Sequence, residues 1–172
     1  ILVARLETDG DLDTTFGATG VFTSSMTSGP DTATDVVVQG NDQIVVAAVG
    51  DIGQNSRPFV VKLTANGAAD SSFGNNGVVE VPLADGSAGQ LKGIVIQDNN
   101  KIVVGGEVRD GVQQDFLTAR LDPDGSLDLS FGGTGVIKTA VGAGNDAGEG
   151  LVIQEDGKIV VVGSAEQNQN FN

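Results

Sequence analysis

The motif Phe-Gly-x-x-Gly occurs three times in this chain, as FGATG (residues 16–20), FGNNG (73–77) and FGGTG (131–135). Successive copies begin 57 and 58 residues apart. A second motif keeps nearly the same period, as QIVV (43–46), KIVV (101–104) and KIVV (158–161). A fixed period of this length indicates a repeat architecture, in which each copy is one unit that stacks on its neighbours.

Each copy contains four segments that resemble short β-strands. One carries Arg5, Lys62 or Arg120 directly before a leucine, and another follows the FGxxG motif. The other two are β-branched runs, such as VVVQ (36–39) and QIVV (43–46), separated by residues that tolerate positive φ, which is a hairpin signal. The 26 glycines recur every few residues, and no window has helical periodicity. The sequence therefore predicts an all-β fold.

Four strands per copy predict a β-propeller-like tandem repeat of three four-stranded blades. We divide residues 1–172 into one repeat array with approximate copies 1–57, 58–114 and 115–172. A β-trefoil or β-prism-like three-fold fold is the alternative, because it also uses three four-stranded repeats. Closed propellers typically have four to eight blades. We therefore expect the chain to be a fragment of a longer array, or part of an oligomeric ring or filament.

The phenylalanine of FGxxG is predicted to pack between sheets rather than to form a ligand site. Phenylalanine is the only aromatic type, with seven Phe and no Trp or Tyr. Gly-rich loops that bind phosphate lie at the start of a helix and carry a Lys-Ser or Lys-Thr pair, and neither feature accompanies these motifs. If fully buried, each ring would contribute about 1.5–3 kcal/mol to stability.

Two stretches of the third copy, LDPDGSLDLSFGGTG (121–135) and VIQEDGKIVVVGSA (152–165), resemble the delta-60 repeat family of bacterial proteins. The resemblance covers essentially the whole chain in three copies. It is weaker in the hairpin of the first copy and in the turn of the second. It implies a β-propeller-like module found in tandem in long secreted or surface proteins. Because the family is recognised by its repeat rather than by an activity, no catalytic residues carry over.

Charge and composition exclude several classes of partner. The chain has 9 Lys and Arg against 23 Asp and Glu, a net charge of −14, which disfavours nucleic-acid binding. No apolar run approaches the roughly 20 residues of a membrane-spanning helix, so we expect no membrane insertion. The absence of cysteine excludes disulfides and thiolate metal sites. These features agree with the extracellular or cell-surface location that the resemblance implies.

Calcium is the one cofactor that the acidic turns suggest, and otherwise none is expected. Alternating aspartates can converge several oxygens on this ion. The candidate ligands are Asp9, Asp11 and Asp13 in the first copy, and Asp122, Asp124 and Asp128 in the third. The second copy has lost two carboxylates of this set. The competing interpretation, which we favour, is that Asp9 and Asp124 stabilise tight turns and that Asp13 and Asp128 cap the backbone entering FGxxG.

The sequence predicts no enzyme. Without histidine or cysteine, Ser-His and Cys-His nucleophile pairs and His-ligated zinc sites are impossible. The expected function is a non-catalytic structural or adhesive repeat module of a secreted or cell-surface bacterial protein, with self-assembly as one possibility. Its expected partners are further copies of the same repeat, in cis or in trans. The alternative is a ligand-binding β-propeller whose site is completed by blades outside this segment.

Overall fold

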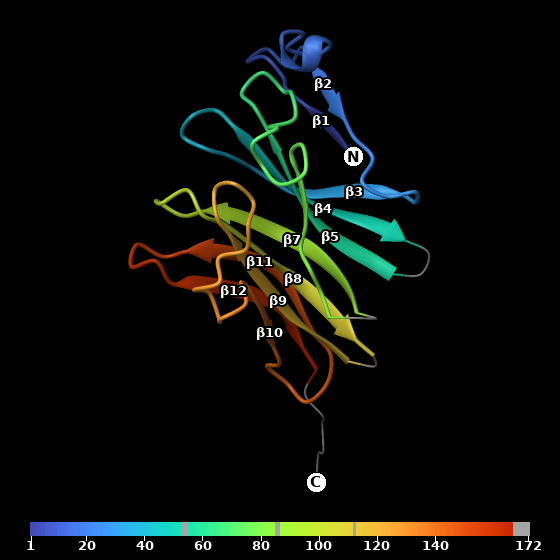
Figure 1. Ribbon diagram of the computed structural model, residues 1–172, viewed down its shortest axis with the longest axis vertical. Helices are drawn as coiled ribbons and strands as arrows, with labels where there is room; N and C mark the ends of the chain where they lie inside the picture. Colours follow the sequence, from blue (N-terminus) through green and yellow to red (C-terminus); the bar gives the residue numbers. More distant parts are fainter. Residues whose placement is uncertain (53–54, 85–86, 112, 167–172) are drawn as a thin grey trace.

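The fold is an all-β stack of antiparallel sheets. In the computed structural model, which describes residues 1–52, 55–84, 87–111 and 113–166, the chain forms twelve strands and one short 3-10 turn, η1 (Phe16–Ala18). The sheets follow one another along the long axis of the molecule, from the N-terminal pair at one end to the C-terminal pair towards the other (Figure 1). The predicted all-β class is confirmed.

Two of the sheets are complete four-stranded blades in which each strand pairs with the next along the chain. The first blade consists of β3 (Asp31–Val38), β4 (Ile44–Ile52), β5 (Asn55–Leu63) and β6 (Val78–Glu80). The second consists of β7 (Ala88–Ile96), β8 (Ile102–Asp110), β9 (Gln113–Leu121) and β10 (Val136–Thr139). All of these pairings are antiparallel.

The remaining strands form two two-stranded sheets, where three four-stranded blades were expected. One sheet pairs β1 (Leu2–Ala4) with β2 (Val21–Thr23), and the other pairs β11 (Asp146–Ile153) with β12 (Ile159–Ala165). The difference arises because the VVVQ-type segment is the first strand of a blade and the strand after FGxxG is the last. The sequence copies 1–57, 58–114 and 115–172 therefore each begin in the second half of a sheet.

The predicted hairpins join the first two strands of each blade. In the first, Gln39 N donates to Gln43 O over 2.8 Å, and Asp42 adopts a φ of 61°. Asn100 takes the same left-handed conformation in the second hairpin, and Gly157 does so in the third. Asn, Asp and Gly are the residues that accept this conformation at least cost, so the turn chemistry fixes the register of each pair.

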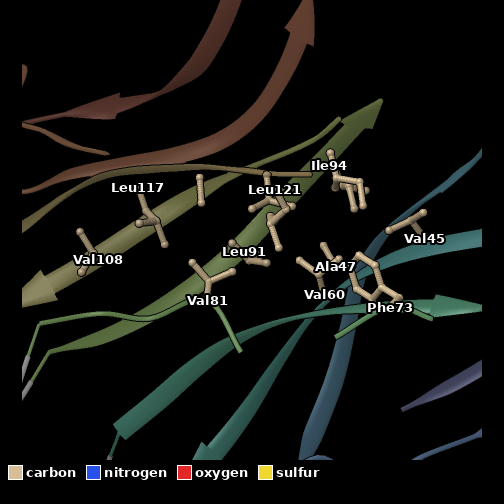
Figure 2. Close-up of a cluster of buried hydrophobic side chains, with 13 residues drawn as sticks. Val45, Ala47, Val60, Phe73, Val81, Leu91, Ile94, Val108, Leu117 and Leu121 are labelled. Carbon is tan, nitrogen blue, oxygen red and sulfur yellow. The ribbon is translucent and has the colours of Figure 1, made fainter. Parts of the chain in front are cut away.

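The largest core lies between the two complete blades. Val45, Ala47 and Val60 of the first blade form one buried cluster with Leu91 and Ile94 of β7 (Figure 2). Strand β7 packs against β3, β4 and β5, and β11 packs in the same way against β7, β8 and β9. Strands covered on both faces lose the usual alternation of apolar and polar residues, which accounts for the continuous IVV runs.

The sequence predicts that the phenylalanines of all three FGxxG motifs fill the space between sheets, and this is confirmed for the first two copies. Phe16 and Phe73 are fully buried. Phe16 packs with Ile44 and Val61 of the first complete blade, while Phe73 belongs to the large core of Figure 2. Phe131, in the third copy, is only half-buried.

Candidate functional site

A charged cluster recurs where β1, β5 and β9 end, and it is the most regular polar feature of the described residues. Each cluster joins a basic residue, an aspartate eight positions later, a hydroxyl residue two positions after that, and the phenylalanine of FGxxG. We call these the junction clusters, and their members are Arg5, Asp13, Thr15 and Phe16; Lys62, Asp70, Ser72 and Phe73; and Arg120, Asp128, Ser130 and Phe131.

The basic residue and the aspartate form an ion pair in all three clusters. Arg5 Nε lies 2.6 Å from Asp13 Oδ2, and Arg120 Nε lies 2.6 Å from Asp128 Oδ2. In the middle cluster, which has lysine, the Nζ–Oδ2 distance is 3.6 Å. The aspartates are buried, so each carboxylate needs a bonded partner to remain charged there.

The second carboxylate oxygen of each aspartate holds the backbone ahead of the phenylalanine. Asp128 Oδ1 accepts hydrogen bonds from Ser130 N at 3.0 Å and Ser130 Oγ at 2.6 Å. Asp70 accepts the same pair from Ser72 at 3.0 and 2.6 Å. The first cluster repeats this arrangement with a threonine. The predicted capping role of these aspartates is confirmed.

Each basic group also lies over the ring of its phenylalanine. The guanidinium carbons of Arg5 and Arg120 lie 4.9 and 4.6 Å from the ring centroids of Phe16 and Phe131. Lys62 Nζ lies 5.7 Å from the centroid of Phe73. At these separations a cation is attracted to the face of an aromatic ring. The cluster therefore fixes the ring from one side, while the core packs against it from others.

The first two clusters bind the turn of the following repeat. Gly17 N donates to Asn66 O over 2.8 Å, and Gly74 N donates to Asp124 O over the same distance. The basic side chains add a second bond to the same turns, since Arg5 Nη1 donates to Ala65 O at 2.5 Å. Lys62 makes the corresponding contact with the turn that contains Asp124. These two clusters thus connect one sheet to the next.

A glycine in the bound turn allows this close approach. Gly67 has a φ of +81°, and a Cβ there would lie 2.7 Å from two ring carbons of Phe16. Gly125 packs against Phe73 in the same way, with a Cβ position 3.0 Å from the ring. Gly10 holds the equivalent turn position of the first repeat and has no atom within 4 Å of its Cβ position.

A residue from the hairpin turn completes the cluster in both full blades. Gln43 Nε2 donates to Asp70 Oδ2 over 2.9 Å, and Lys101 Nζ lies 2.8 Å from Asp128 Oδ2. Hydrogen bonds from Lys101, then from Ser130 and Arg120, hold the pKa of Asp128 well below its usual range. Hydrogen bonds to Asp122 and Asp128 raise the pKa of Lys101 in turn.

The calcium candidates are divided among separate contacts. Lys101 Nζ lies 2.8 Å from both Asp122 and Asp128. Together with Arg120, which pairs with Asp128, it balances the charge of the two carboxylates that the fold brings together. Asp124 accepts a hydrogen bond from Ser126 N, and Asp9 accepts one from Asp11 N. Within the described ranges, no three acidic side chains gather in an arrangement that could hold a metal ion.

The interpretation of Asp9 and Asp124 as turn-stabilising residues agrees with these bonds. Of the two remaining candidates, Asp13 is paired with Arg5, and Asp11 is exposed. Sequence reasoning missed the role of the basic residues. Their signal was present in the constant spacing of eight between Arg5 and Asp13, repeated in the other two copies.

The family described as "domain of unknown function (DUF5122) beta-propeller" matches this chain over residues 1–16, 39–73, 97–131 and 154–172. These segments make up more than half of the sequence. The chain belongs to the DUF5122 beta-propeller family. A comparison with curated proteins gave no match. The β-propeller repeat implied by the delta-60 resemblance is thereby confirmed.

The two internal segments that match the DUF5122 beta-propeller run from a hairpin turn to the phenylalanine of FGxxG. Together with residues 1–16 they contain every member of the three junction clusters. The segments between them carry the last strand of one blade, a connecting loop and the first strand of the next. No helix in the described part of the chain is long and apolar enough to cross a membrane.

Replacement of Gly67 tests the contact between ring and turn. Gly67→Ala and Gly10→Ala both place a side chain at positive φ, which costs about 1–2 kcal/mol. Only Gly67→Ala also forces a methyl group against Phe16, which we expect to add about 1–3 kcal/mol. Urea unfolding of both variants measures the difference. Equal destabilisation would contradict the proposed role of the ring contact.

The lowered pKa of Asp128 predicts a loss of stability in acid. Its folded pKa lies below the unfolded value of about 3.9, so the carboxylate stabilises the fold above that pH and the contribution is lost as pH falls through the folded pKa. We expect Asp128→Asn to lower the urea midpoint at neutral pH and to reduce the further fall in acid. Asp11→Asn, at an exposed aspartate, is the control and should keep the wild-type pH profile.

Calcium removal should leave the stability of the chain unchanged. The carboxylates of Asp122 and Asp128 are already paired with Lys101 and Arg120, and a ligand stabilises a protein only in proportion to its occupancy. We therefore expect the same melting temperature in excess calcium and in excess chelator. A higher melting temperature in calcium would restore the six aspartates as metal ligands.

Proposed function

We propose that this chain is a non-catalytic structural module of a secreted or cell-surface bacterial protein. The observation that carries the proposal is that the repeated polar residues bond to one another and to the neighbouring repeat. In each junction cluster the charged and hydroxyl groups bond to one another, and in the first two they also bond to the next turn. Repeated groups that serve blade cohesion in this way favour a scaffold over a reaction site.

The loops between blades support a role in presenting variable surface. The connections from the last strand of one sheet to the first strand of the next are SSMTSGP (24–30), VPLADGS (81–87) and AVGAGN (140–145). They differ in sequence and lie outside the segments that match the family. A structural array tolerates such differences at exposed loop positions, because surface loops vary more freely than the strands they connect. Val81 is an exception, since it lies in the core between the two complete blades. We propose that the exposed residues of the loops 24–30 and 140–145 form the surface through which an adhesive role would act.

The acidic composition supports an exposed, soluble scaffold. A net charge of −14 keeps copies apart in solution except where a specific surface holds them together. The ion pairs of the junction clusters remove part of this repulsion locally, since they place a cation beside each buried aspartate. The proposed module is therefore cohesive between blades and repulsive over the rest of its surface.

Labelling of intact bacteria tests the proposed location. An antibody against the chain should label intact cells that carry the gene, or detect the protein in the medium, while an antibody against a cytosolic protein labels only lysed cells. Gly67→Ala should reduce the amount of protein that resists external protease, and Gly10→Ala should reduce it less. Labelling that requires lysis would contradict the proposal.

A further inference from the structure

A cavity recurs between successive hairpin turns. The turns that join β3 to β4, β7 to β8 and β11 to β12 project from the same side of the stack, at the left of Figure 1. A cavity of about 360 Å³ is lined by residues of the first and second turns, and one of about 580 Å³ by residues of the second and third. Both volumes lie within the range of roughly 300–1,000 Å³ that is typical of small-molecule sites.

The two cavities are built from equivalent positions of the repeat. Each is lined by the glutamine that directly follows the first strand of a blade, by the two residues after it, and by the positive-φ residue of the next turn. These residues are Gln39, Gly40, Asn41 and Asn100 in the first cavity, and Gln97, Asp98, Asn99 and Gly157 in the second. The cavity is therefore a feature of the repeat rather than of one loop.

The glutamine is the residue of this set whose side chain has no evident role within the fold. It occurs in all three copies, as Gln39, Gln97 and Gln154, and three of the segments that match the family begin at it. Gln39 is only 6% exposed, yet its Oε1 atom and that of Gln97 make no hydrogen bond within the described residues. Because an unpartnered buried amide is costly, its repeated use indicates a partner outside the chain.

The amide chemistry favours a ligand that carries hydroxyl groups. Rotation about the last side-chain bond of Gln39 exchanges its Oε1 and Nε2 atoms, so the amide can turn either a donor or an acceptor towards the cavity. A hydroxyl group both donates and accepts, and so satisfies either orientation. Asn41 and Asn100 add two more amides to the same cavity. Neighbouring hydroxyls on a sugar ring suit such a set, because one amide can bond to two of them.

The charges around the cavities favour a neutral ligand. The second cavity is lined by the carboxylates of Asp98 and Glu155, and the whole chain has a net charge of −14, so both repel anions. Lys62 lines the first cavity, but its Nζ atom already donates to Pro123 O over 3.3 Å and lies 3.6 Å from Asp70. A phosphate or a uronic acid therefore finds no unpaired cation in either lining.

We propose that the two cavities bind sugar units of a neutral hexose polymer, with the amides of Gln39 and Gln97 bonded to sugar hydroxyls. Two equivalent sites on one chain can engage one polymer together, so the polymer binds more tightly than a single sugar. The site goes beyond the structural role proposed above. It lies at the end of β3 and β11 that is opposite to loops 24–30 and 140–145.

Electrophoresis in native gels that contain a polysaccharide is the first test. The net charge of −14 drives the chain through the gel, and a bound neutral polymer retards it. The probes are dextran, mannan and galactan, with alginate as the acidic polymer and an unrelated acidic protein as the mobility reference. At least one neutral polymer should retard the chain, and alginate should not. Mobility unchanged by all three neutral polymers would overturn the proposal, as would equal retardation by alginate.

Replacement of the glutamines tests the site. Gln39→Ala removes an amide whose oxygen has no partner in the fold, so far-UV circular dichroism should show the wild-type β structure. The loss of one hydrogen bond should raise the apparent Kd for the retarding polymer by about 5- to 10-fold. The double variant Gln39→Ala, Gln97→Ala should lose most of the retardation. Gln113→Ala, at an exposed glutamine on the β8–β9 hairpin, is the matched control and should bind like the wild type.

Gly40→Leu provides a second, steric test. Gly40 lines the first cavity, has no positive φ, and has no atom within 4 Å of its Cβ position. A leucine there should leave the fold intact and occupy the space of the ligand, and so raise the apparent Kd at least as much as Gln39→Ala does. Retardation that both variants leave unchanged would overturn the site even if the wild-type chain binds a neutral polymer.

This site and the proposed structural module fail separately. A chain that labels on intact cells but passes every neutral gel unretarded would overturn the sugar site alone. A chain that binds a neutral polymer but labels only after lysis would overturn the proposed location alone.

Discussion

The contact on which the rest of the structure depends is the aromatic ring of one repeat packed against the turn glycine of the next. Phe16 against Gly67 is the clearest case, because even a methyl group at Gly67 would lie within 2.7 Å of the ring. The ion pair between Arg5 and Asp13 holds the ring in place from the other side. A charged cluster thus orients a hydrophobic contact between blades. The hydrogen bonds between its charged groups are stronger where water is excluded.

Much of the fold could be predicted from the sequence, because its signals are local and occur three times. The hairpin turns contain Asp42 and Asn100, which are residue types that accept positive φ. The burial of Phe73 follows from the apolar runs around it. The division into blades could not be predicted, because period alone does not tell which strand of a repeat comes first in a sheet. That choice depends on hydrogen bonds between segments such as β5 and β6.

The candidate site was only partly visible from the sequence. The capping role of Asp128 follows from its position two residues before a serine, which is a local relation. The contact of Lys101 with Asp122 and Asp128 joins a hairpin turn to a turn about twenty residues later, and strand pairing must be known before such a contact can be found. The acidic residues alone therefore suggested a calcium site, whereas in the fold Lys101 is the cation that pairs with them.

Each of the first two junction clusters binds the turn of the repeat that follows it, so a repeat between two others carries one half of this contact at each end. A tandem duplication inserted between two repeats would bring its own cluster and its own turn, and neither neighbour would need to change. If a repeat were lost, the cluster before it would bind the turn of the repeat after it. Genes for such chains can therefore lengthen and shorten by whole units, while loops such as SSMTSGP (24–30) diverge without weakening the stack.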